Sequence, residues 1–304
     1  MKKYAVFAAA IIALLTACQT KTSANKNRAV IMSSNEIIHD MIKSIGGDFI
    51  EARSATRPGS DPHLYKATEK DLISITDSSL IIYNGSHLER RLEWAIGKIG
   101  NITPAISITG YIPEDKLIRR EKSRKTNPHF WHDASLWRQT ASFIADNLTE
   151  MNPVNEPVYR RNEEIYIYKL NELDKYIREK TAGIPKNKRF IVTEHDAFAY
   201  FGKAYGFQTL SLQGIDTSEE ISSADINRFA DIIAEKNIHT VFTEASFPDR
   251  NIRLLQSILK SRGYFVKIGG VLYSDTLIAG GSYEDTMRYN IDTIANALED
   301  GNND

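Results

Sequence analysis

The feature that most constrains the fold of this chain is an uninterrupted segment in its middle. Residues 158–181 contain no glycine and no proline, and charged and apolar side chains alternate densely along them. Four apolar residues recur there at spacings of four, three and four, so they share one helix face: Tyr166, Leu170, Leu173 and Ile177. At 1.5 Å per residue, such a helix is about 36 Å long, which is enough to run the height of a domain.

The ends of this helix are also marked in the sequence. Pro157 suits the first turn of a helix, and Gly183 followed by Pro185 suits its end. Two placements fit the pattern: a rigid connection between two lobes, or a long surface helix within one domain. We interpret residues 158–183 as a linking helix because a strand–helix alternation restarts directly after it.

On both sides of this helix, short β-branched segments alternate with amphipathic ones. That alternation favours parallel sheets covered by helices on both faces. The 304 residues also favour two domains, because single cores stop growing near about 250–300 residues. We expect strands at 29–33, 49–55, 79–83, 105–108, 190–193, 208–212, 240–243 and 264–268, and helices at 36–45, 87–99, 134–150, 197–205, 224–236, 250–262 and 285–299.

The composition is that of a globular protein, with 42% hydrophobic and 25% charged residues. The formal net charge is −1, without the strong basic excess that is usual in nucleic-acid-binding proteins, so we expect no nucleic-acid partner.

The first residues predict export and a lipid anchor. Lys2 and Lys3 precede an apolar run at residues 5–15, which is shorter than the roughly 20 residues of a membrane-spanning helix. This is typical of a signal peptide, here residues 1–17. Leu15-Thr16-Ala17-Cys18 resembles the bacterial lipobox, which predicts acylation at Cys18 and a flexible tether over residues 18–28. The alternative is an ordinary signal peptide that happens to contain a cysteine.

Four residues are candidate metal ligands because they lie in loops or directly after expected strands. His63 and His129 lie in loops directly after prolines, and a neighbouring proline restricts the backbone. His195 follows the expected strand 190–193, and Asp275 follows the last expected strand. Ligands of parallel sheets bind at such carboxyl ends.

Three imidazoles and one carboxylate are suitable donors for zinc, manganese or ferrous iron. The spacing alone is a weak signal, because the residues are scattered along the chain and no H-E-x-x-H motif is present. A histidine after a strand is often a structural residue, and that interpretation stays open on the residues alone.

For the remaining histidines we expect structural roles. We predict that His132 caps a helix or faces solvent, that His87 begins and caps a helix, that His39 lies on a helix face, and that His239 starts a strand. The tryptophans are expected to pack in the core or between lobes: Trp94, Trp131 and Trp137.

Taken together, the motifs along the chain carry a family resemblance. They are Gly46-Gly47-Asp48, Asp61-Pro62-His63-Leu64-Tyr65, Tyr83-Asn84-Gly85, Asn127-Pro128-His129-Phe130-Trp131, His195-Asp196-Ala197-Phe198, Gln213-Gly214-Ile215-Asp216-Thr217, Phe242-Thr243-Glu244 and Leu272-Tyr273-Ser274-Asp275. In order and spacing the chain resembles the metal-binding solute receptors of zinc/manganese-type ABC importers, the cluster A-I substrate-binding lipoproteins. The resemblance covers nearly all of the chain after the signal peptide.

The resemblance implies an α/β fold of two Rossmann-like lobes with parallel sheets, joined by one long helix. The lobes would be residues 29–157 and 184–304. It also implies that His63, His129, His195 and Asp275 bind the metal, with Glu244 orienting a ligand imidazole. Manganese-associated members often carry glutamate where this chain has His195. Many zinc-dedicated members have a histidine-rich loop where residues 114–125 are basic and lack histidine, which argues against a dedicated zinc scavenger.

The function implied is transport, not catalysis. The receptor would capture a divalent transition metal outside the cytoplasm, at the periplasmic face or the cell surface, and deliver it to an ABC permease with its cytoplasmic ATPase. We expect a monomer bound to the membrane through Cys18. The alternatives are a metal-dependent hydrolase using the same histidines and aspartate, a receptor for haem or a siderophore, and a surface adhesin.

The lipobox leads to the first testable prediction. Replacement of Cys18 by serine removes the thiol that is acylated, so we expect Cys18→Ser protein to leave the membrane fraction or to remain unprocessed. Fractionation followed by mass determination of the N-terminus measures this. A Cys18→Ser protein that stays in the membrane and is trimmed at the same position would contradict the lipoprotein interpretation.

Overall fold

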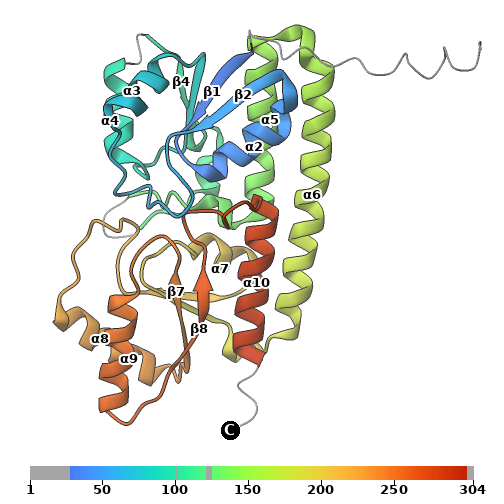
Figure 1. Cartoon of the computed structure of the whole chain (residues 1–304). Helices are drawn as coiled ribbons and strands as arrows, with labels where there is room; N and C mark the ends of the chain where they lie inside the picture. The colour runs from blue at the N-terminus through green and yellow to red at the C-terminus, as the bar shows by residue number, and fades with distance from the viewer. Residues whose placement is uncertain (1–27, 100–101, 121–124, 300–304) are drawn as a thin grey trace, which may run out of the picture.

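The computed structural model describes residues 28–99, 102–120 and 125–299. The expected signal peptide, Cys18 and nearly all of the tether lie outside these residues. Two α/β lobes are stacked on one another, and a single long helix runs along both of them (Figure 1). Among the described residues, no helix has the length and apolar character needed to cross a membrane.

The N-terminal lobe is built on a four-stranded parallel sheet. Its strands lie in the order β2 (Ile50–Ser54), β1 (Ala29–Ser33), β3 (Leu80–Tyr83) and β4 (Ala105–Ser107). Its helices are α2 (Glu36–Gly46), α3 (Glu69–Thr76), α4 (Arg90–Ile99) and α5 (Ala134–Met151). Side chains alternate along the strands: Ile31 and Ile82 pack with α2 and α5, whereas Met32 and Ile81 pack with α3 and α4.

The C-terminal lobe repeats this plan with two parallel strand pairs. β5 (Phe190–Thr193) pairs with β6 (Gln208–Ser211), β7 (Thr240–Glu244) pairs with β8 (Lys267–Leu272), and β5 lies beside β7. The helices are α7 (Ala199–Tyr205), α8 (Ser223–Glu235), α9 (Arg250–Ser261) and α10 (Tyr283–Glu299). Val192 and Val241 pack with α8 and α9, and Ile191 and Phe242 pack on the side of α10.

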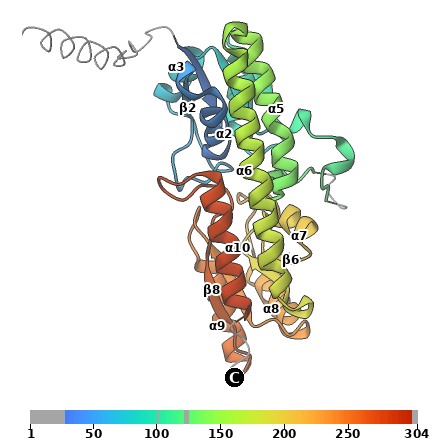
Figure 2. The same ribbon diagram turned by 90° about the vertical axis from the view of Figure 1, so that its right-hand side faces the viewer.

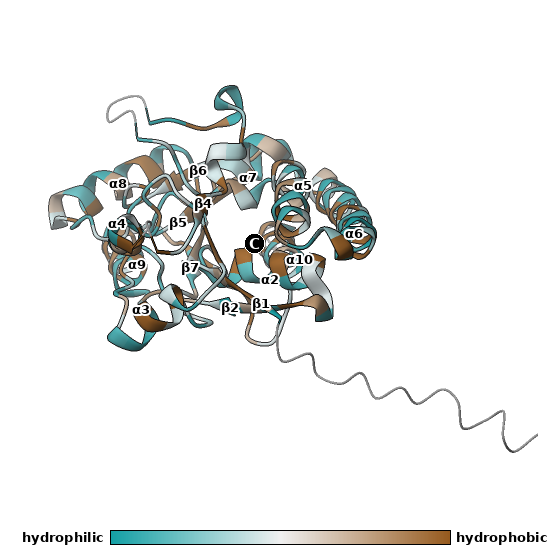
Figure 3. Ribbon diagram, turned by 90° about the horizontal axis from the view of Figure 1, so that it is seen from above, coloured by the Kyte–Doolittle hydropathy of each residue, from teal (hydrophilic) through white to brown (hydrophobic). Residues whose placement is uncertain are grey.

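The long helix α6 (Glu156–Gly183) packs against α2 and α5 in one lobe and against α10 in the other (Figures 1 and 2). The four apolar residues predicted to share one face are all buried: Tyr166, Leu170, Leu173 and Ile177. One continuous hydrophobic core includes this face and apolar residues from both lobes. Seen from above, the sheets lie between a layer of α2, α5, α6 and α10 and a layer of α3, α4, α8 and α9 (Figure 3). The predicted α/β fold of two lobes with parallel sheets is confirmed.

Two local expectations need correction. Helix α3 was not predicted, although Thr68 and Asp71 form a capping box at its start. Strand β8 lies at 267–272 instead of 264–268, because Gly269 and Gly270 made this segment a poor strand candidate. A Cβ at Gly269 would lie 2.7 Å from atoms of Phe242 and Ala297, so only glycine fits where the strand crosses beneath α10.

The prediction for the tryptophans is correct for two of the three. Trp131 and Trp137 are buried in the core, but the side chain of Trp94 on α4 is 69% exposed. The apolar face of α4 that packs on the sheet is formed by Leu92 and Ile96, so Trp94, between them in sequence, points outward.

Candidate metal centre

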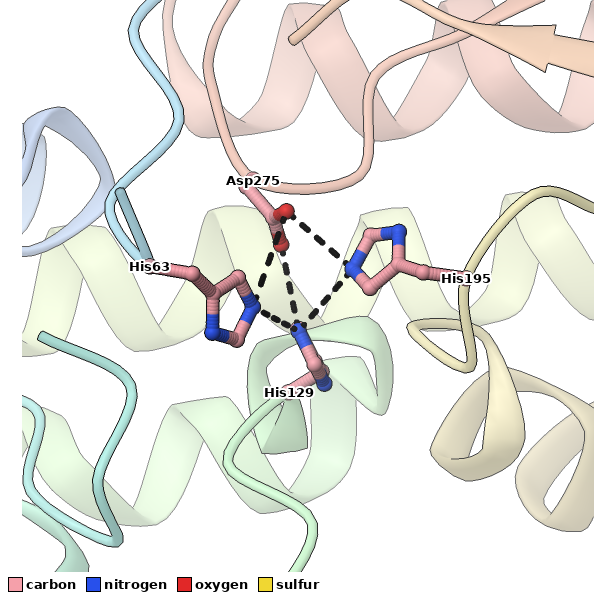
Figure 4. Close-up of side chains that lie close together, drawn as sticks. All are labelled: His63, His129, His195 and Asp275. Atoms are coloured by element: carbon pink, nitrogen blue, oxygen red, sulfur yellow. Dashed lines mark hydrogen bonds and ion pairs between the residues drawn. The ribbon is translucent and has the colours of Figure 1, made fainter. Parts of the chain in front are cut away.

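The four candidate ligands, more than 200 positions apart at the extremes of the sequence, converge on one point between the lobes (Figure 4). His63 and His129 come from loops of the N-terminal lobe, and His195 and Asp275 from loops after β5 and β8 of the C-terminal lobe. One donor atom from each residue lies within 4.8 Å of all the others.

The separations of these donor atoms match those expected around a small metal ion. His129 Nε2 lies 3.2 Å from His63 Nε2 and 3.2 Å from His195 Nε2. The Asp275 carboxylate lies 3.3 Å from His129 Nε2, 3.1 Å from His195 Nε2 and 4.0 Å from His63 Nε2. Donors about 2.0–2.1 Å from a tetrahedral ion are about 3.3 Å apart, so the cluster fits such an ion with a small movement of His63.

The four side chains are buried. The exposed fractions are 7% for His63, 0% for His129 and His195, and 2% for Asp275. Apart from the three imidazoles, no described residue donates a hydrogen bond to either oxygen of Asp275. Burying a carboxylate without a full set of partners is costly, so this arrangement favours a bound cation.

A local turn fixes the imidazole of His129. Asn127 Oδ1 accepts a hydrogen bond from the His129 backbone N–H at 3.0 Å and lies 2.8 Å from His129 Nδ1. Because an amide oxygen can only accept, Nδ1 carries the proton and the lone pair on Nε2 points into the cluster. The neutral tautomer needed for metal binding is therefore set by the neighbouring residue.

Glu244 at the end of β7 holds His195. Its Oε1 accepts hydrogen bonds from the backbone N–H groups of Glu194 and His195 at 2.9 and 3.0 Å, and its Oε2 lies 2.7 Å from His195 Nδ1. This contact directs Nε2 toward the cluster, the arrangement by which carboxylates orient metal-binding imidazoles. Glu194 does not belong to the cluster and accepts a hydrogen bond from Asn251.

Asp275 is positioned through the residue before it. The carbonyl oxygen of Ser274 accepts hydrogen bonds from Trp131 Nε1 at 3.0 Å and from His132 Nε2 at 2.9 Å. Both donors are buried in the N-terminal lobe, on the segment that follows His129. His129 and Asp275 are thereby linked across the lobe boundary.

The charges in the cluster are strongly coupled. Burial lowers the pKa of His63 to about 3 and also lowers the pKa of His129. Burial opposes the charged forms of His195 and Asp275 as well, but their mutual attraction, with Glu244 beside His195, prevails. The pKa of His195 is therefore raised well above its ordinary value, and that of Asp275 is held well below its ordinary value. Because of this raised pKa, His195 carries a second proton on Nε2. A metal ion that binds to Nε2 would displace that proton.

The other histidines lie outside the cluster. The prediction that His132 caps a helix or faces solvent is wrong: it is buried, and its ring lies 4.4 Å from that of Phe198. His87 does not cap a helix, since it precedes α4 and contacts Glu93 with an exposed side chain. His239 lies just before β7, where Nδ1 contacts the carbonyl of Phe265.

Sequence reasoning missed the polar residues that hold the ligand loops, although a signal was present. Asp61-Pro62-His63 and Asn127-Pro128-His129 are the same pattern, a short polar side chain two positions before a histidine. In both, its oxygen accepts the histidine backbone N–H, at 2.8 Å from Asp61 and 3.0 Å from Asn127. Such turns are typical of aspartate and asparagine, so the repeated pattern could have identified both residues.

Comparison with known proteins identifies the family. Residues 31–297 match the ZnuA family, described as zinc-uptake complex component A, periplasmic. The chain belongs to this family. It is 35% identical to the manganese-binding lipoprotein MntA of Bacillus subtilis, over 94% of this chain and 95% of that protein. It is 32% identical to the zinc-binding protein TroA of Treponema pallidum, over 92% of both chains.

A third relative and a solved structure agree with this assignment. The iron-binding protein YfeA of Yersinia pestis is 30% identical, over 94% of this chain and 91% of that protein. The structure of TroA superimposes with a TM-score of 0.87 at 33% identity, covering 90% of this chain and 99% of that chain. The predicted family is confirmed, and its relatives are named for three different metals.

The geometry predicts how single substitutions change metal affinity. Alanine at His63, His129, His195 or Asp275 leaves an incomplete set of donors, so we expect affinity to fall by more than the roughly 10–100-fold typical of losing an outer contact. Glu244→Gln should fall within that smaller range. Competition with a coloured chelator measures these affinities.

His87→Ala is the matched control for these variants, because His87 is exposed and its ring bonds to Glu93 rather than to the cluster. We expect it to bind metal like the parent chain. An affinity unchanged in His195→Ala, or reduced as much in His87→Ala as in His129→Ala, would show that the four residues are not the ligands.

Proposed function

We propose that this chain is an extracytoplasmic receptor that binds one divalent transition metal ion between its lobes and delivers it to an ABC permease with a cytoplasmic ATPase. The observation that carries the proposal is the buried cluster of three imidazoles and one carboxylate, two ligands from each lobe. We further propose that residues 29–157 and 184–304 are the two lobes, with residues 158–183 linking them. Cys18, once acylated, would keep the receptor at the outer face of the membrane.

The donor set supports transport over hydrolysis. A catalytic metal site keeps an open position for water, whereas four protein donors complete a tetrahedral shell. A hydrolase also needs a general base beside the open position. Among the carboxylates close to the cluster, Glu244 lies against His195 Nδ1 and accepts two backbone N–H groups, and Glu194 accepts from Asn251. Asp61 accepts the His63 backbone N–H and the hydroxyl of Thr217. No observation favours the hydrolase alternative.

The small size of the cluster argues against the larger ligands haem and siderophores. Donor atoms within 4.8 Å of one another surround a single ion and leave no space for a haem or a siderophore between them. The adhesin alternative depends on exposed surfaces, and nothing in the cluster supports it. A bare metal ion is therefore the cargo that we propose.

The relatives are named for manganese, zinc and iron, so their names do not select one metal. We therefore propose the metal from the chemistry of the donor atoms. Three nitrogens and one carboxylate oxygen at near-tetrahedral separations suit zinc bond lengths of about 2.0–2.1 Å. Divalent zinc also binds such donors more tightly than manganese or ferrous iron does. Zinc should therefore bind most tightly in vitro, while the ion carried in cells depends on what is available.

A cavity beside His63 offers a route from the surface to the cluster. A cavity of about 240 Å³ reaches the ring of His63, and its other walls include His87, Arg90, Ile215 and Asp216. His63 is also the most exposed of the four ligands. The ion would thus enter and leave on the side of His63.

Metal binding should stabilise the folded chain. An ion that binds only the native state adds RT ln(1 + [L]/Kd), about 4 kcal/mol at a concentration a thousandfold above Kd. We expect the purified chain to bind one Zn²⁺ ion and to unfold at a clearly higher temperature with Zn²⁺ than with excess chelator. Calorimetry and metal analysis measure both quantities. An identical unfolding temperature in both conditions, with no bound metal, would contradict a metal receptor.

A further inference from the structure

The four ligands are not held equally. Three of them, His129, His195 and Asp275, are fixed by buried contacts with neighbouring residues. Asn127 holds His129 and also donates from Nδ2 to the carbonyl oxygen of Asp196 at 2.9 Å, in the other lobe. Glu244 holds His195. Asp275 follows Ser274, whose carbonyl accepts two buried ring N–H groups. These three ligands form a platform that already spans both lobes.

His63 is held differently. Its Nδ1 has neither a hydrogen bond nor an ion pair among the described residues. The Nδ1 of His129 bonds to Asn127, and that of His195 lies 2.7 Å from the carboxylate of Glu244. In Figure 4 its ring approaches the cluster from a loop of its own. This His63 loop, residues 55–68, lies between β2 and α3 and also lines the cavity that leads outside. The imidazole therefore depends on the loop for its position.

The carboxylate of Asp61 joins this loop to the opposite lobe. Its Oδ1 accepts the His63 backbone N–H at 2.8 Å, and its Oδ2 accepts the hydroxyl of Thr217 at 2.6 Å. A second hydroxyl, on Thr276, accepts the Gly59 backbone N–H at 2.8 Å. Both threonines belong to the C-terminal lobe, and each follows an aspartate: Asp216 at the cavity and Asp275 at the metal cluster.

The contacts between the lobes are therefore stronger on one side of the boundary than on the other. On the side of α6 the lobes share a continuous hydrophobic core. The His63 loop is instead joined to the C-terminal lobe by two hydrogen bonds that involve threonine hydroxyls. One joins half-buried Asp61 and Thr217, and the other joins exposed Gly59 to buried Thr276. A single hydrogen bond of this kind contributes little to stability, so the loop can detach while the core remains packed.

We propose that His63 is the ligand that leaves first when the metal is released, and that Asp61 and Thr217 are positioning residues that hold it on the metal. Detachment of the His63 loop leaves the ion on the platform of His129, His195 and Asp275, open toward the cavity. The inference rests on the proposed function, because it assigns the order in which that site opens. On this proposal, the metal has all four ligands only while Asp61 of the N-terminal lobe is bonded to Thr217 of the C-terminal lobe.

The test measures the release of Zn²⁺ from the purified full chain into excess coloured chelator by stopped-flow absorbance. Thr217→Val removes the hydroxyl with little change in shape, and we expect release about three- to tenfold faster, the range for one lost hydrogen bond. Asp61→Ala removes both contacts and should speed release further. Thr217→Ser restores the hydroxyl and should return the rate to that of the parent.

Ser218→Ala is the control, because Ser218 lies on the same loop but bonds to Asp216 within its own lobe. It should release Zn²⁺ at the parent rate. Equal rates for Thr217→Val, Asp61→Ala and the parent would overturn the role of Asp61 and Thr217, even with the metal site intact. So would an effect of Ser218→Ala as large as that of Thr217→Val. A parent chain that takes up no Zn²⁺ would instead overturn the proposed function.

Discussion

The structure depends on an arrangement of lone pairs that is unfavourable by itself. Asn127 fixes the proton of His129 on Nδ1, so the Nε2 lone pair points toward the carboxylate of Asp275 and the other imidazoles. All of these atoms are buried. In a low-dielectric interior, converging lone pairs repel one another unless a proton or a cation lies between them. The proton of His195 balances the charge of Asp275, and a metal ion would take its place by displacing it.

The fold brings these atoms together by placing strand ends of two lobes face to face. His195 and Asp275 follow parallel strands of one lobe, and the loops of His63 and His129 face them from the other. Helix α6 and the shared core fix the distance between the lobes at the back of the site. In the proposed order of release only the His63 loop at the front moves, so release of the ion would require no large hinge motion.

The sequence predicted those parts of the structure that depend on local pattern. The period of Leu170, Leu173 and Ile177 identified the long helix, and the alternation of segments identified the two parallel-sheet lobes. The convergence of the four candidate ligands could be expected only through the family resemblance, because residues so far apart in sequence leave no local signal. The bond from His132 to Ser274 joins residues 142 positions apart, so no local pattern predicts it. Trp94 was expected to pack in a core, but Leu92 and Ile96 form the buried face of its helix and Trp94 lies on the opposite face.

The most direct test of the proposed metal site is a crystal structure of the zinc-loaded chain with anomalous scattering recorded on both sides of the zinc absorption edge. We expect one strong anomalous peak per chain, about 2.0–2.2 Å from Nε2 of His63, His129 and His195 and from an oxygen of Asp275. A peak at another position, or an ion bound by residues of only one lobe, would contradict the proposed site.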